Sequence, residues 1–208
     1  MKHLFSLVAG VFFLCGNAFS SDEAPDVMVK RVTDEVLGIV RADKDIQSGN
    51  SKKAVELVET KVLPHFNFNR MTALAVGRDW NKANPDQKKR LAKEFETLLV
   101  RTYSNALTAY RSQTVTYKPL KMQPGDTDVM VRTEIRQPGQ QAVQLDYGVE
   151  KSDSGWKVYD VVVAGISLVT NYRETFAQEV RSGGIDGLIA SIAAKNKQIE
   201  ARSEKKQG

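Results

Sequence analysis

Few side chains in this sequence of 208 residues could act as nucleophiles, proton carriers or metal ligands. The chain has one cysteine, Cys15, and two histidines, His3 and His65. A serine or cysteine nucleophile needs a histidine or another base within hydrogen-bond reach, and zinc sites combine several cysteines and histidines. No glycine-rich segment has phosphate-binding spacing. Catalysis by paired carboxylates stays open, but no pattern marks a particular pair, so the sequence favours a protein that is not an enzyme.

The N-terminal residues have the layout of an export signal. Lys2 precedes a largely apolar run over residues 4–16, which is too short for a membrane span of roughly 20 apolar residues. Ala18 and Ser20 place small side chains at the two positions that a signal peptidase reads. We therefore expect residues 1–20 to be cleaved as a signal peptide, in preference to an uncleaved membrane anchor.

Removal of this segment leaves a mature domain with no cysteine and with His65 as its single histidine. No disulfide or cysteine-bound metal is then expected. His65 lies between two predicted helices, where a capping or surface role is the simplest interpretation. Without Lys2 the domain keeps 29 of the 30 basic residues against 25 acidic ones, a net charge of about +4. Such a charge weakly favours anionic lipid surfaces, and export argues against a nucleic-acid partner.

Apolar residues at steps of three and four predict helices on both sides of a central region. The clearest helix begins at Asn84-Pro85-Asp86-Gln87, which combines an N-cap side chain, a proline at the first helical position and a glutamine at N3. An apolar stripe follows it from Leu91 to Tyr110. Other amphipathic patterns predict helices near residues 25–43, 50–64, 68–77 and 168–192.

In the central region the apolar period changes to 2, which is typical of strands. The alternation predicts strands over residues 128–135, 141–150 and 156–164, with a weaker one over 114–120. The turn signals Gln137-Pro138-Gly139 and Ser152-Asp153-Ser154-Gly155 separate them by hairpin-length links. The strands therefore form an antiparallel sheet.

Helices, then a sheet, then helices predict an α+β fold, in which several helices cover one face of a curved antiparallel sheet of about four strands. Residues 21–208 are expected to form one domain, and the mostly charged residues 195–208 to fray. The apolar stripes fit either a filled core or a cavity between sheet and helices, because both use the same residue types.

Two segments resemble a known family in order and spacing. The first runs from Val62 to Tyr103 and contains Pro64-His65-Phe66-Asn67, and the second runs from Val158 to Ile189 and contains Ile166-Ser167-Leu168-Val169-Thr170-Asn171-Tyr172-Arg173. Together they resemble the MlaC (toluene-tolerance) family over essentially the whole mature chain. The strands between them match that family in pattern rather than in residues.

The resemblance implies a soluble, monomeric periplasmic protein that holds phospholipid acyl chains in a deep apolar cleft between sheet and helices and uses no cofactor. Members of the family shuttle lipid between an outer-membrane lipoprotein–porin complex and an inner-membrane ABC transporter with an MCE-type lipid-binding component. This exchange maintains the lipid asymmetry of the outer membrane.

We expect apolar residues of the long helix, the sheet and the return segment to line the cleft. They are Phe95, Leu99, Tyr103, Val131, Tyr147, Val149, Val163, Ile166, Leu168, Val169, Tyr172 and Phe176. Arg173 could contact a lipid phosphate through its forked guanidinium, or could form a structural ion pair.

Two other classes of function remain open at this stage. A periplasmic adaptor or structural protein would have a filled core and no bound lipid. A small hydrolase or isomerase would place a buried acid or His65 in a polar cleft, because one fold can host many functions.

Overall fold

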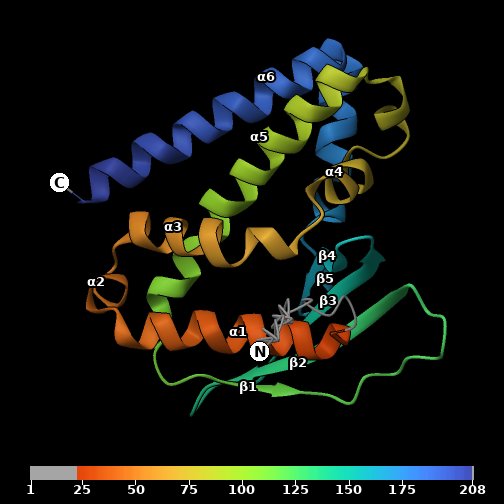
Figure 1. Cartoon of the computed structure of the whole chain (residues 1–208). Helices are drawn as coiled ribbons and strands as arrows, with labels where there is room; N and C mark the ends of the chain where they lie inside the picture. The colour runs from red at the N-terminus through yellow and green to blue at the C-terminus, as the bar shows by residue number, and fades with distance from the viewer. Residues whose placement is uncertain (1–22, 208) are drawn as a thin grey trace, which may run out of the picture.

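The computed structural model describes residues 23–207, with side chains described as far as Ser203. The predicted signal peptide, residues 1–20, lies outside the described residues. Five strands form one sheet; the first helix runs along it, and the last two long helices extend away from it (Figure 1). None of the helices in the described part of the chain has the length and apolar composition that a membrane crossing needs.

The sheet is an antiparallel meander in which each strand pairs with the next one along the chain. Its strands are β1 (Thr114–Tyr117), β2 (Asp128–Arg136), β3 (Val143–Ser152), β4 (Gly155–Val163) and β5 (Ile166–Ser167). The predicted α+β fold with a curved antiparallel sheet is therefore confirmed, and β5 adds one short strand to the expected four.

A tight turn at Ala164 and Gly165 produces this extra strand. Their φ angles are 49° and 85°, and two successive left-handed residues close a two-residue hairpin whose twist matches that of the flanking strands. Alanine rarely adopts a positive φ. The turn therefore has no sequence signal of the Asn-Gly kind, and the alternating pattern alone does not predict β5.

The helices follow the predicted apolar patterns. They are α1 (Pro25–Ala42), α2 (Lys44–Gln47), α3 (Ser51–Lys61), α4 (Phe68–Val76), α5 (Pro85–Tyr103) and α6 (Arg173–Gln207), with 3₁₀ turns η1 (Leu63–His65), η2 (Gly77–Lys82), η3 (Ser104–Ala109) and η4 (Thr170–Tyr172). The expected capping box is present at α5, where Asn84 and Gln87 satisfy each other's backbone N–H groups. Gly184, with φ of 67°, bends α6 between its two apolar stripes.

Residues 195–207, for which the sequence predicts fraying, continue α6 along α5. The buried Asn196 side chain donates to the Glu94 carbonyl oxygen at 3.0 Å. Arg101 of α5 donates to both carboxylate oxygens of Glu200 at 3.1 and 3.0 Å, and Ile199 packs against the helical core. Contacts with α5 thus hold this segment as far as Glu200.

The apolar side chains form two cores. The first lies between the sheet and α1 and includes Val36, Val131 and Val149. The second lies among α4, α5 and α6, where Phe95 is fully buried and its ring meets those of Tyr172 and Phe176 at centroid distances of 5.2 and 5.3 Å. Phe66 packs against both cores and so connects the two layers.

A polar cluster fastens α4 to the sheet. Arg70 pairs with Asp128 and Glu150, and its guanidinium lies 3.6 Å from the centroid of the Tyr159 ring. The Tyr159 hydroxyl donates to Asp128 at 2.7 Å, and the Asn67 amide donates to Glu150 at 2.6 Å. Burial raises the pKa of Tyr159 to about 12, so this hydroxyl stays a donor at physiological pH.

The Tyr159 ring of this cluster lies so close to residue 148 that only a glycine fits there without a shift. A Cβ on residue 148 would lie 2.9 Å from Cζ of Tyr159, and that ring is held by Asp128 and Arg70. We therefore expect Gly148→Ala to lower the free energy of unfolding by about 1–3 kcal/mol in urea titrations, because the ring must move to avoid overpacking. The double variant Gly148→Ala/Tyr159→Leu should recover part of that loss relative to Tyr159→Leu alone; an unchanged penalty would show that the ring is not the obstacle.

Candidate functional site

An apolar cavity of about 320 Å³ lies between α1 and the sheet. Its lining residues are Met28, Val29, Val32, Thr33, Val36 and Leu37 of α1; Val62, His65 and Phe66 around η1; Ala106, Leu107 and Tyr110 around η3; and Val115, Ile135, Leu145, Tyr147 and Val158 from four strands. The walls therefore come from both the N-terminal helices and the sheet, which are far apart in sequence.

Two periodicities aim these side chains at one space. Residues of α1 that are three and four apart lie on one helical face, and Val29, Val32 and Val36 are all buried there. In the sheet, directly paired residues share a face, which puts Leu145 and Tyr147 beside their partners Thr133 and Val131 on β2. The helix stripe and this sheet face thus enclose the cavity.

The polar groups in the lining are few and mostly engaged. The Tyr110 hydroxyl donates to the Gln113 carbonyl oxygen and accepts a bond from the Arg41 guanidinium at 2.6 Å. Burial raises the pKa of the Tyr147 phenol well above its usual range, while the Thr33 hydroxyl acts in the opposite direction. Among the lining residues that the structure describes, only His65 can exchange a proton near neutral pH. The arrangement suits the shelter of hydrocarbon better than the breaking of bonds.

His65 provides a pH test of the cavity wall. Burial, followed by the charges of Arg31 and Lys157, lowers the pKa of His65, against a smaller opposing effect of Glu23 and Glu35. The folded state therefore disfavours the imidazolium. This contribution to stability is fully present above the unfolded-state pKa of about 6.5 and is lost as the pH falls towards the folded-state value.

We accordingly expect the NMR titration midpoint of the His65 ring to lie below 6.5. The free energy of unfolding should fall between pH 7.5 and pH 5, and His65→Gln should reduce that slope. A midpoint at or above 6.5 would contradict the placement of the ring.

The apolar face of the sheet continues past the enclosed cavity. Val163 pairs with the lining residue Leu145 and also with Ile166 of β5, so all three share a face. Ile166 is 61% exposed, and Val143, which pairs with the lining residue Ile135, is 41% exposed. Partly exposed apolar side chains thus continue the sheet face that lines the cavity.

The structure places the sheet residues of the predicted lining together. Tyr147 lines the cavity. Val131 and Val149 are buried in the core against which α1 packs, and Val163 and Ile166 lie on the open continuation of the same face.

The helical residues of the predicted lining lie in the other core. Phe95, Leu99, Val169 and Phe176 are buried among α4, α5 and α6, and Tyr172 packs against them. Tyr103, at the end of α5, is 38% exposed, and Leu168 is half-buried. The structure therefore divides the predicted set between two sides of the molecule.

Arg173 is the first residue of α6, and its side chain reaches the C-terminal end of α4. Its Nε and Nη2 atoms donate to the Leu74 carbonyl oxygen at 3.1 and 2.9 Å, and its side chain lies 3.9 Å from a Cβ built on Gly77. In this position the guanidinium satisfies one of the helix-end carbonyl groups that have no partner within the helix.

Lining residues that the prediction did not include come chiefly from α1, η1 and η3. The stripe of Val29, Val32 and Val36 is visible in the sequence, but its period shows only that one face is buried. Nothing in the pattern states that this face meets a cavity. Leu107 and Tyr110 continue the stripe of α5 into η3, which was the available signal for them.

Comparison with known proteins places this geometry in context. The family described as MlaC protein matches residues 30–194. The chain is 26% identical over 191 residues to a toluene tolerance protein of Pseudomonas putida, covering 88% of each chain. It is 23% identical over 197 residues to the intermembrane phospholipid transport system binding protein MlaC of Haemophilus influenzae, covering 92% of each.

A solved structure shares the fold over most of the described residues. It is a phospholipid-binding protein from Ralstonia solanacearum in complex with a phospholipid, with a TM-score of 0.80 and 40% sequence identity. The likeness covers 86% of this chain and 99% of that one, and so extends over both the sheet and the helical layer.

Proposed function

The chain belongs to the MlaC family, and we propose that it is a periplasmic carrier that shelters the acyl chains of a phospholipid between α1 and the sheet. The observation that carries this proposal is the apolar cavity, together with the partly exposed apolar sheet face that continues from it. The Ralstonia solanacearum protein, whose sequence is 40% identical to this chain, contains a bound phospholipid, and this supports the proposal.

Acyl-chain burial supplies the driving force for such a carrier. Removing a methylene from water is worth about 0.8 kcal/mol, so a phospholipid with roughly 30 methylenes gains on the order of 24 kcal/mol before costs. The enclosed volume of about 320 Å³ lies at the lower end of the range for ligand pockets. Two acyl chains therefore also require the open face formed by Val163 and Ile166.

We infer a division of roles among the predicted lining residues. Val131, Tyr147, Val149, Val163 and Ile166 belong to the sheet face that supports the acyl chains. Phe95, Leu99, Val169 and Phe176, with Tyr172 packed against them, stabilise the helical core, and Tyr103 and Leu168 remain partly exposed outside the apolar cavity.

Delivery then depends on partners rather than on catalysis. We infer export through the predicted signal peptide and exchange of lipid between an outer-membrane lipoprotein–porin complex and an inner-membrane ABC transporter with an MCE-type component. Acyl chains are much more stable in the cavity than in water, but about as stable there as in a bilayer. We therefore infer that contacts with a partner reshape the cavity and release the lipid. The carrier acts as a monomer, needs no cofactor and hydrolyses nothing.

Native mass spectrometry of protein purified without detergent tests this function. We expect a diacyl phospholipid at near-stoichiometric occupancy, and transfer of that lipid to phospholipid vesicles when the partner complexes are present. A filled-core adaptor would instead give a single apo mass and take up no lipid from vesicles beside those complexes. Release of fatty acid or of a free head group from bound phospholipid would favour the hydrolase alternative.

A further inference from the structure

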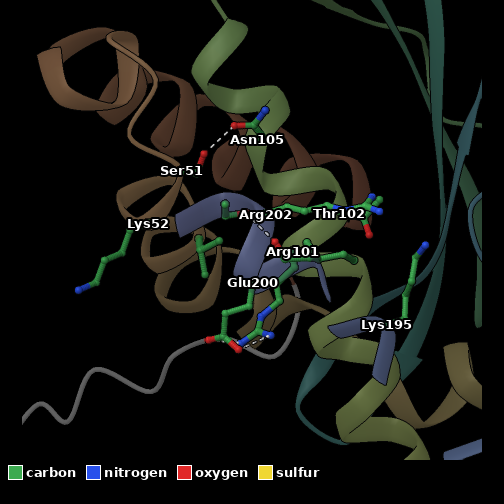
Figure 2. Close-up of a pocket in the computed structure, with 11 residues that line it drawn as sticks. Ser51, Lys52, Arg101, Thr102, Asn105, Lys195, Glu200 and Arg202 are labelled. Carbon is green, nitrogen blue, oxygen red and sulfur yellow. Dashed lines mark hydrogen bonds and ion pairs between the residues drawn. The ribbon is translucent and has the colours of Figure 1, made fainter. Parts of the chain in front are cut away.

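A second hollow, of about 720 Å³, lies where the C-terminal part of α6 passes α3 and the end of α5 (Figure 2). We call it the α3–α6 groove. It shares no lining residue with the apolar cavity. Part of its wall, residues 195–203 of α6, lies beyond the segment 30–194 that matches the family. The groove is therefore a separate feature from the proposed lipid site.

The groove has a strong positive charge. Its lining contains Lys52, Arg101, Lys195 and Arg202 but a single carboxylate, Glu200, for a net charge of +3. Glu200 is engaged by Arg101, as the dashed lines in Figure 2 show. Within the described residues, Lys52, Lys195 and Arg202 form no ion pair, so three exposed cations can pair with a ligand.

The floor of the groove is apolar and its walls are held in place. Val55 of α3 and Ile199 of α6 are half-buried lining residues. Arg101 and Glu94 of α5 hold α6 through Glu200 and the buried Asn196. At the start of α3, the Ser51 hydroxyl donates to the Asn105 side chain of η3 at 2.9 Å. A partner that fills the groove thus needs both hydrocarbon side chains for the floor and negative charge for the rim.

We propose that the α3–α6 groove binds an acidic amphipathic helix of a partner protein. Such a helix presents apolar residues at i, i+3, i+4 and i+7 on one face and carboxylates beside them, which matches the floor and the cations of the groove. A second copy of this chain is a poor occupant, because the mature domain has a net charge of about +4. A flat anionic bilayer reaches the cations but not the floor between two helices.

Fluorescence anisotropy tests the pairing with a synthetic 20-residue helix that has leucine on one face and glutamate on the other. The groove variant is Lys52→Glu/Lys195→Glu/Arg202→Glu. The control is Lys44→Glu/Lys121→Glu/Lys151→Glu, which makes the same charge change at exposed positions outside the groove. We expect the groove variant to bind the peptide about tenfold more weakly than the control variant does, because it loses three attractive exposed charge pairs. Val55→Ser should also weaken binding.

The peptide itself has two matched controls. An analogue with glutamine in place of glutamate should lose most of its affinity, and so should one with serine in place of leucine. Equal weakening by the two triple variants, undiminished binding of the glutamine or the serine analogue, or no binding of the acidic peptide would each overturn the proposal. A groove-specific loss of binding to anionic vesicles, with peptide binding unchanged, would also overturn it and assign the surface to a membrane.

Lipid occupancy in native mass spectra separates this proposal from the carrier function. We expect both triple variants to keep the lipid content of the parent protein, because the groove and the cavity share no residue. Loss of lipid in the groove variant alone would show that the groove affects lipid binding, and it would contradict the separation of the two sites. A parent protein without lipid that still binds the peptide would leave the groove supported and the carrier function rejected.

Discussion

Leu145→Lys is expected to remove phospholipid from the purified protein while leaving it folded. Leu145 lines the cavity, is only half-buried, and pairs with Val163 on the sheet face that continues beyond the lining. In the empty protein a lysine at this position can extend its ammonium into water. Acyl chains in the cleft would bury that charge, and a cost of only about 2 kcal/mol lowers the binding constant for lipid roughly 30-fold.

The measurement is lipid per protein by native mass spectrometry, with thermal unfolding as the check on folding. Met130→Lys is a matched control, because Met130 is a 37% exposed apolar residue of β2 that pairs with Gly148 on the other face of the sheet. This control should retain its lipid. Full occupancy in Leu145→Lys would place the acyl chains elsewhere in the molecule.

Phe95→Ala is expected to have the largest effect on stability. Phe95 is 0% exposed and contacts the rings of Tyr172 and Phe176 edge-on. Its truncation removes these contacts and leaves a cavity among α4, α5 and α6, at a cost of about 3–5 kcal/mol. For a domain of this size the melting temperature should fall by roughly 10 °C.

The same variant decides whether Phe95 acts in the core or in lipid binding. If it serves only the helical core, Phe95→Ala retains its lipid when measured well below its melting temperature. Phe95→Leu, which keeps most of the buried volume, should recover most of the stability. A loss of lipid without a loss of stability would move Phe95 from the core to the lining of the cleft.

Some parts of the fold follow from local patterns in the sequence. The capping signal at Asn84-Pro85-Asp86-Gln87 correctly predicts the start of α5, because its chemistry involves neighbouring backbone groups only. The period-2 segments likewise predict β2, β3 and β4. The turn at Ala164 and Gly165 was missed, since a non-glycine residue with positive φ has no local signature.

The candidate site was less predictable than the fold. Valine stripes in α1 and in β2–β4 have the same composition whether they meet filled core or empty space. The long stripe of α5 was expected to face the cleft, but Phe95 and Leu99 pack against α6. Arg173, expected either at a lipid phosphate or in an ion pair, meets the carbonyl oxygen of Leu74, which is 99 residues away in sequence.

The sequence by itself determined the type and order of the main helices and strands, the family and most of the buried face of each main helix, because these depend on spacing within one segment. Only the tertiary structure decided which buried faces meet each other. That choice depends on contacts between distant segments, such as Arg70 with Glu150 and Arg101 with Glu200. For the same physical reason, the cavity under α1 and the groove beside α6 exist only once the layers are assembled.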